Sequence, residues 1–148
     1  MARKTIQRIN IADVEYVAFQ LAKKFMEWSE PIPDFETRFP NKLESCIETP
    51  FQTFDRKSLY KGLIAKASIL FYLMIKNHPF QNGNKRIAVT TLLFFLLQNG
   101  RWLHVSNDAL YDFAKDVAKS NAEKKDSVLQ GIENFIKNAL ENSSRLSA

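Results

Sequence analysis

A short polar stretch, residues 78–86, lies between two of the most apolar segments of the chain, and this arrangement constrains the fold more than any other feature. The preceding segment, 59–75, has apolar residues at helical spacing and predicts a helix. Proline clashes with an α conformation of the residue before it, so Pro79 should end this helix. We therefore expect His78 to lie just past the helix end with its imidazole free.

The segment after the polar stretch, 87–97, is apolar on nearly every side and predicts a helix buried all round. An Asn-Gly pair at 99–100 predicts its end. The first-turn N–H groups of such a helix have no partners inside the helix, and Asn84 can cap one of them. The others attract anions, helped by the helix dipole, and Gly83 allows a close backbone approach to a ligand.

Two cations follow at Lys85 and Arg86, and arginine can bind phosphate through two parallel hydrogen bonds. These features together predict a phosphate cradle with His78 beside it, where a histidine acting as general base contributes roughly 10²- to 10⁴-fold to rate. Each residue alone also fits a simpler interpretation. Asn82 and Gly83 are a common turn pair, the cations can be solvated, and a lone histidine after a helix is more often a capping or solvated residue.

The stretch resembles the signature of the Fic and Doc proteins, the Fido superfamily, whose Fic branch has His-x-Phe-x-(Asp/Glu)-Gly-Asn-Gly-Arg-x-x-Arg. Here Lys85 replaces the second glycine and Val89 replaces the last arginine, and both changes are those of the Doc (death on curing) branch. The resemblance implies a mainly α Fido fold with about five to six helices around a buried central helix and a small extended flap. It implies one domain over residues 1–148, with a motif core at about 45–105.

The resemblance also implies roles for single residues. His78 matches the base that deprotonates a target hydroxyl, and Phe80 matches the side chain that anchors the loop in the core. Gly83, Asn84 and Arg86 match residues that hold the nucleotide phosphates. Lys85 matches the lysine associated in Doc with an inverted nucleotide and transfer of the γ-phosphate of ATP.

Asn82 departs from the family pattern, because many members have an acidic residue there that holds Mg²⁺. A carboxamide oxygen can coordinate the ion but brings no charge, and Mg²⁺ prefers carboxylates and phosphate oxygens. We therefore treat Asn82 as a doubtful metal ligand.

Three classes of function remain open on the sequence. The leading hypothesis is a Doc-like toxin that transfers the γ-phosphate of ATP to a Ser or Thr hydroxyl of a translation factor, with elongation factor Tu as the family precedent. AMP transfer of the Fic type is its alternative. The second class is a noncatalytic nucleotide- or peptide-binding relative, favoured by Asn82. The third is a helix-turn-helix DNA binder, whose second helix would be too apolar to lie in a groove.

Partners and location follow from weaker signals. The chain shows no (Ser/Thr)-x-x-x-Glu-(Gly/Asn) inhibitory motif, which implies restraint by an antitoxin supplied as another chain. A net charge of +5 and a pI of about 9.4 suit ATP, an acidic partner or nonspecific nucleic acid equally. Cys46 is the only cysteine, so no internal disulfide can form, and a cytoplasmic setting without membrane contact is expected.

The rest of the chain predicts helices joined by loops. Residues 1–9 read as a basic arm, and the tail 142–148 reads as frayed. The segment 47–54 is expected to be extended, either as the family's flap over the active site or as an ordinary loop packed by its two phenylalanines. The first predicted helix begins at Asn10 and ends near Trp28, and a proline-rich loop is predicted from Ser29 to Pro40. A short helix is predicted from Asn41 to Cys46. Two further helices are predicted after the central one, the first capped by Ser106 or Asn107 and the second running from Asp126 to about Leu140.

Overall fold

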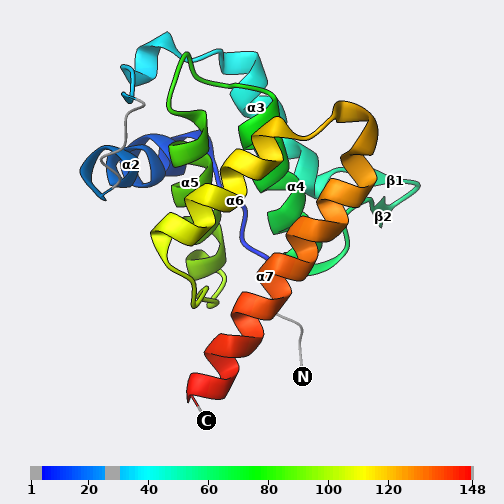
Figure 1. Ribbon diagram of the computed structural model, residues 1–148. Helices are drawn as coiled ribbons and strands as arrows, with labels where there is room; N and C mark the ends of the chain where they lie inside the picture. The colour runs from blue at the N-terminus through cyan, green and yellow to red at the C-terminus, as the bar shows by residue number, and fades with distance from the viewer. Residues whose placement is uncertain (1–4, 26–30, 148) are drawn as a thin grey trace.

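The computed structural model describes residues 5–25 and 31–147. It is mainly α-helical, with a small two-stranded hairpin, which confirms the expected fold class (Figure 1). The main helices are α2 (Phe19–Phe25), α3 (Pro40–Glu48), α4 (Gly62–Lys76), α5 (Asn84–Gln98), α6 (Asn107–Lys119) and α7 (Lys125–Ser147).

Helices α4 and α5 form the centre of the fold. They pack against each other, α6 contacts both, α7 packs against α4, and α2 packs against α5. Ten consecutive residues of α4, from Lys66 to Ile75, are buried, and α5 is buried over most of its length. The helix of the polar stretch is therefore a core element, and it is not free to enter a DNA groove. Every helix in the described ranges is too short or too polar to span a bilayer.

The first helix begins where the sequence predicts. Asn10 and Asp13 form a capping box, in which the Asn10 side chain accepts from the Asp13 N–H at 2.8 Å and Asp13 accepts from the Asn10 N–H at 2.9 Å. The helix runs from α1 (Ile11–Asp13) through a π-helical turn (Val14–Ala18) into α2. Its expected end at Trp28 lies outside the described residues.

The described part of the proline-rich segment, 31–39, is irregular, as predicted, apart from a 3-10 turn at Phe35–Thr37. Helix α3 then confirms the short helix expected after it, although it begins at Pro40 and continues to Glu48. Proline is well tolerated in a first helical turn, where its missing N–H would have no partner.

The prediction that residues 47–54 are extended is largely wrong. Its first residues end α3, and a 3-10 turn occupies Thr49–Phe51. Gln52 has an extended backbone, and Thr53–Phe54 (β1) pairs with Lys57–Ser58 (β2) across a two-residue turn with positive φ at both residues. That turn geometry suits the twist of a short hairpin.

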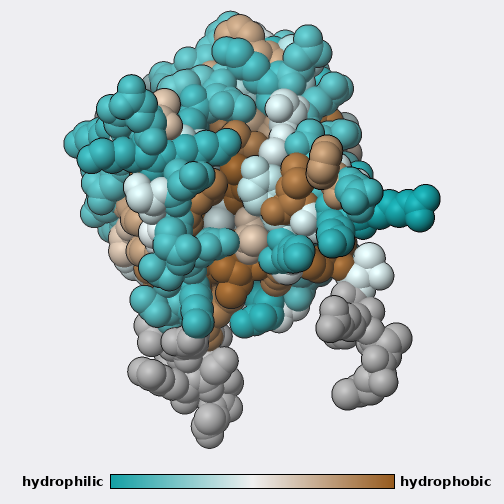
Figure 2. Space-filling view, turned by 90° about the vertical axis from the view of Figure 1, so that its right-hand side faces the viewer, coloured by the Kyte–Doolittle hydropathy of each residue, from teal (hydrophilic) through white to brown (hydrophobic). Residues whose placement is uncertain are grey.

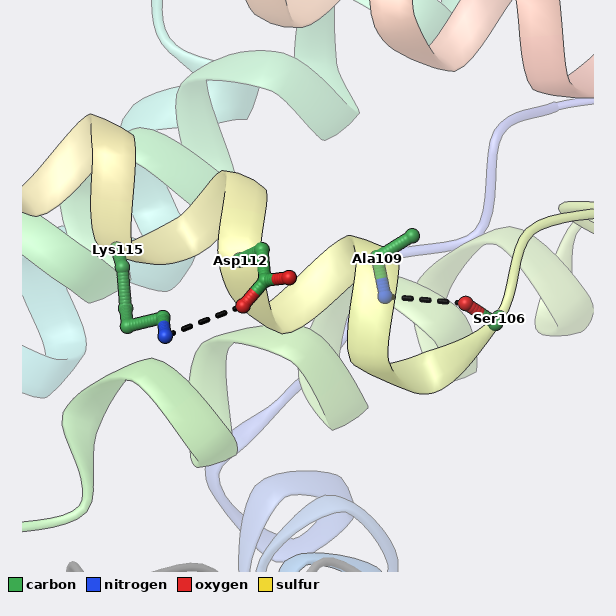
Figure 3. A network of polar contacts seen from close by, with 4 residues as sticks. All are labelled: Ser106, Ala109, Asp112 and Lys115. Carbon is green, nitrogen blue, oxygen red and sulfur yellow. Dashed lines mark hydrogen bonds and ion pairs between the residues drawn. The ribbon is translucent and has the colours of Figure 1, made fainter.

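Helix α6 begins at the predicted cap. The Ser106 hydroxyl accepts from the Ala109 N–H at 3.0 Å, and Lys115 pairs with Asp112 one turn apart at 3.1 Å (Figure 3). At the C-terminal end of α6, the Ser120 carbonyl accepts a hydrogen bond from the Lys76 ammonium of α4 at 2.6 Å. Helix α7 continues to Ser147, past the point where fraying was predicted.

The face that carries the hairpin and α7 in Figure 1 has hydrophobic residues gathered in its middle, with hydrophilic residues around them (Figure 2). Half-buried apolar residues border the core from several elements, among them Leu63 of α4 and Leu129 of α7. The hydrophobic core is thus only partly covered by polar residues on this side.

Candidate functional site

The polar stretch forms the loop between α4 and α5, and both of its ends are fixed by buried helices. Phe80 is buried at 1% exposure in the middle of this loop. Its ring lies 5.6 Å from Phe19 and 5.9 Å from Phe35, measured between centroids. Phe80 therefore occupies the position expected of an anchor and ties the loop to α2 and to the proline-rich segment.

Asn84 does not cap α5, contrary to the prediction. The cap is Gly83, whose φ is 73° and whose carbonyl accepts from the Ile87 N–H at 3.0 Å. Asn84 is the first residue of the helix, and its amide turns back into the loop. The amide oxygen accepts from the Phe80 N–H and the amide nitrogen donates to the Phe80 carbonyl, both at 2.9 Å. Asn84 thus makes two hydrogen bonds to the backbone of one loop residue, an arrangement that we call a bracket. These bonds close the loop into a ring.

His78 lies past the end of α4 and is exposed, as expected. Its backbone differs from the prediction, because φ is +49°, in the left-handed region, whereas an extended conformation is usual before proline. The imidazole Nδ1 lies 3.5 Å from the Asn84 amide nitrogen, at the outer limit of a hydrogen bond. The bracket on the loop therefore also holds the histidine ring loosely.

Four of the predicted site residues line one small cavity of about 120 Å³. They are His78, Gly83, Asn84 and Lys85, and Asn82 lies in the same wall. The lining is completed by Gln81, by Ile75 at the end of α4 and by Ala118 near the end of α6. The cavity lies at the N-terminus of α5, where the helix dipole favours an anion.

Arg86 is placed differently from its neighbours. It is 4% exposed, it does not line the cavity, and its guanidinium donates to the Ala22 carbonyl at 2.6 Å. That bond joins the start of α5 to α2. Phosphate binding by Arg86 stays a prediction, since its side chain would have to reach the cavity from this buried position.

The residues present do not form a Mg²⁺ site of their own. The Asn82 oxygen already accepts from the Gly83 N–H at 2.9 Å, and the described residues contain no group of three His, Cys, Asp or Glu side chains able to hold a metal ion. A neutral oxygen engaged in a turn is a poor ligand for an ion that prefers carboxylates.

The segment Pro31–Phe39, which we call the strap, lies against the loop, and no pattern in the sequence indicated this contact. The Phe39 N–H donates to the Pro79 carbonyl at 2.8 Å, and Pro31 and Ile32 pack on Gly83. These contacts join residues about 40 to 50 positions apart, and no local pattern encodes them.

Two alternatives were open for the segment 47–54, a flap over the active site or an ordinary loop packed by its two phenylalanines. The hairpin leads into the start of α4, whereas His78 follows the end of that helix (Figure 1). Helix α4 has 15 residues and is about 22 Å long, so the chain enters and leaves it at points about that far apart. Of the two phenylalanines expected to pack there, Phe51 contacts Phe95 in the core, and Phe54 is exposed.

Two other residues with reactive side chains lie outside the cavity. Burial raises the pKa of the Cys46 thiol to about 12, which keeps it protonated and unreactive at neutral pH. His104 is exposed in the link between α5 and α6, and its backbone N–H donates to the Ala139 carbonyl at 3.5 Å.

The fold and the cavity define a mainly helical domain with a histidine and an anion-favouring helix N-terminus at one site. The sequence matches the Fic/DOC family over residues 8–96, more than half of the chain, and the protein belongs to that family. The match includes the strap, the hairpin and the motif loop, and it ends within α5. No curated protein and no solved structure matches the chain. Proteins of the Fic/DOC family generally transfer nucleotide-derived groups to other proteins.

Proposed function

We propose that the protein transfers the γ-phosphate of ATP to a Ser or Thr hydroxyl of a target protein, in the manner of the Doc branch. The observation that carries the proposal is that His78, Lys85 and the N-terminus of α5 line the same cavity. A base for a hydroxyl and a site for phosphate are thereby brought to one place.

The phosphate site is built from the start of α5. The first-turn N–H groups of a helix have no acceptors within it, and the positive end of the dipole lies among them. Gly83 has no side chain to keep a phosphate away from this backbone, and Lys85 adds a positive charge in the cavity wall. Such a terminus binds phosphate without further adaptation.

His78 is proposed to take the proton of the target hydroxyl. The hydroxyl oxygen forms a bond to the γ-phosphorus, the bond from this phosphorus to the bridging oxygen breaks, and ADP leaves with that electron pair. In the resting geometry the amide nitrogen of Asn84 lies 3.5 Å from Nδ1 of His78, a long contact in which Nδ1 can act as the acceptor. The ring must turn Nδ1 toward the hydroxyl, and a contact of 3.5 Å is weak enough to break.

AMP transfer is the alternative reaction at the same site. There the hydroxyl would attack the α-phosphorus and pyrophosphate would leave. Lys85 favours γ-transfer, because its position holds glycine in AMP-transferring relatives and lysine in Doc. A binding protein without activity is the other alternative, and the neutral Asn82 in place of an acidic residue supports it.

The test is transfer of label from ATP to protein in a cell extract, with α-labelled and γ-labelled nucleotide compared. His78→Ala should lower the rate of γ-label transfer by about 10²- to 10⁴-fold. His104→Ala is the matched control, because it removes the other histidine, which is also exposed, and it should leave the rate unchanged.

Label arriving from the α position would replace the proposal by AMP transfer. If neither label moves while ATP still binds, the noncatalytic alternative is correct. A His78→Ala protein as active as the parent would remove the assigned base.

The same proposal includes partners of defined kinds. The target would be a protein with an accessible Ser or Thr hydroxyl, with elongation factor Tu as the first candidate, and Mg²⁺ would arrive bound to ATP. An antitoxin encoded as a separate chain would restrain the activity in the cytoplasm.

A further inference from the structure

One wall of the phosphate cavity comes from outside the motif loop. Ala118, in the last turn of α6, lines the cavity together with His78 and Lys85. It is half-buried, and it lies beyond the residues 8–96 that match the family. The position of the end of α6 therefore decides how much room the cavity has beside the motif residues.

The end of α6 is held by a lysine of α4. The Lys76 ammonium donates to the Ala118 carbonyl at 3.3 Å and to the Ser120 carbonyl at 2.6 Å. The last four carbonyls of an α-helix have no N–H partner within that helix, so the ammonium supplies donors where α6 lacks them. Hydrogen bonds from a charged donor are roughly twice as strong as those between neutral groups. Lys76 thus fastens the residue that forms the cavity wall.

Lys76 lies next to the site without being part of its lining. It is the last residue of α4, it follows Ile75 of the cavity wall, and it precedes His78 by two positions. Its side chain does not line the cavity. Lys76 therefore connects the wall that α4 contributes to the wall that α6 contributes.

Three helix ends meet at the cavity, and their dipoles differ in sign. Helices α4 and α6 end there, at Ile75 and Ala118, whereas α5 begins there. A helix C-terminus carries partial negative charge, so the ends of α4 and α6 repel each other. A cation at the end of α4 that binds the carbonyls of α6 reduces this repulsion and keeps the two ends together.

We propose that Lys76 is a positioning residue of the phosphate site. By binding the last carbonyls of α6 it holds Ala118 in the cavity wall, and it thereby sets the width of the space in which the phosphate lies. Ala118 is the other half of this device, because its small side chain leaves the space open. The inference rests on the proposed nucleotide-binding function of the cavity.

Isothermal titration calorimetry of the full chain with Mg-ATP tests the proposal, at a temperature where each variant is shown to be folded. Lys76→Met should bind Mg-ATP about five- to tenfold more weakly than the parent, because the wall is no longer held in one place. Ala118→Val should weaken binding by a similar factor, because two added methyl groups narrow the cavity. In the double variant the two losses should not add, since both changes act on the same wall.

Two control variants separate positioning from other effects. Lys115→Met removes the same charge from α6, where Lys115 pairs with Asp112 at 3.1 Å and does not line the cavity. Asn99→Ala removes two hydrogen bonds at the opposite end of α5 and so lowers stability away from the site. Both variants should bind Mg-ATP like the parent.

Unchanged Mg-ATP affinity in Lys76→Met or in Ala118→Val would overturn the inference, and the second variant decides it if the first does not fold. Losses that simply add in the double variant would also overturn it, because Lys76 would then act without Ala118. An equal loss in either control would do the same, since charge or stability alone would explain the effect. If the parent itself does not bind Mg-ATP, the proposed function is wrong, and this outcome is distinct from variants that bind as well as the parent.

Discussion

The two ends of α5 are built from the same parts and differ in what surrounds them. Gly83 lies before the first turn with φ of 73°, and Gly100 lies after the last with φ of 77°. Each end also has an asparagine whose amide brackets the backbone of one other residue, Asn84 at the first end and Asn99 at the second. The same local chemistry thus appears twice on one helix.

The brackets differ in reach and burial. Asn84 is 8% exposed and holds Phe80, four positions away, inside the motif loop. Asn99 is more exposed and holds Gln7, 92 positions away, accepting from its N–H at 2.7 Å and donating to its carbonyl at 3.1 Å. The first bracket shapes a loop, and the second attaches the N-terminal arm.

The larger cavity lies at the second end. It measures about 630 Å³, against about 120 Å³ at the first, and Leu63 and Leu97 line it together with Gln7 and Asn99. The C-terminal end of a helix repels anions, and no histidine or cation lines this cavity. Cavity size alone would therefore favour the second end of α5, whereas the lining side chains and the helix dipole favour the first end as the place for an anion.

Alanine at the two glycines should separate the ends most clearly. Gly100→Ala should lower the free energy of unfolding by about 1 kcal/mol, because a left-handed backbone costs that much with a Cβ and nothing else lies within 4 Å. Gly83→Ala should cost about 2 to 4 kcal/mol, since Ile32 and the Pro31 carbonyl must also shift. Urea unfolding measures both. Equal losses would show that the strap does not press on Gly83, and Ile32→Ala in the Gly83→Ala background should recover part of the loss.

Removing the two brackets should also give unequal losses. Asn84→Ala should cost about 2 to 3 kcal/mol, because it leaves the Phe80 N–H and carbonyl without partners in a buried loop. Asn99→Ala should cost about 1 kcal/mol, because water can replace its bonds at an exposed site. Thermal and urea unfolding of the two variants give the comparison. A larger loss from Asn99→Ala would mean that the arm contributes more than the loop.

The smallest expected effect is a change in the metal dependence of ATP binding. Asn82→Asp should make ATP bind a few-fold more tightly with Mg²⁺ and more weakly without it, because a carboxylate adds a charged ligand beside the phosphates. Gln81→Glu is the control, since Gln81 lines the same cavity, and its charge should weaken binding under both conditions. If both variants respond alike, position 82 is not next to the metal.

Local pattern predicted the fold well. The apolar spacing of 59–75 and 87–97 identified the two central helices, and residue type alone placed helix starts at Asn10 and at Ser106 or Asn107. Each of these features depends on residues within one or two helical turns. A short stretch of sequence was therefore enough to predict each of these features.

Long-range packing accounts for what was missed. The strap reaches Pro79 and Gly83 only after α2 and α5 have packed, and Arg86 meets Ala22 for the same reason. The turn of the Asn84 amide back toward Phe80 is local, but it competes with capping, and the sequence favours neither. The motif thus indicated which residues share a site, and it did not indicate which distant segments pack against them.

The left-handed backbone at His78 has a consequence for how the protein tolerates substitution. A side chain in this region costs of order 1 kcal/mol, which glycine would not incur and asparagine would incur less. A library screened for heat resistance alone should therefore accumulate glycine and asparagine at position 78, whereas a library screened for transfer should retain histidine. A difference between the two screens in the residue selected at position 78 would show that His78 is retained for transfer at a cost in stability.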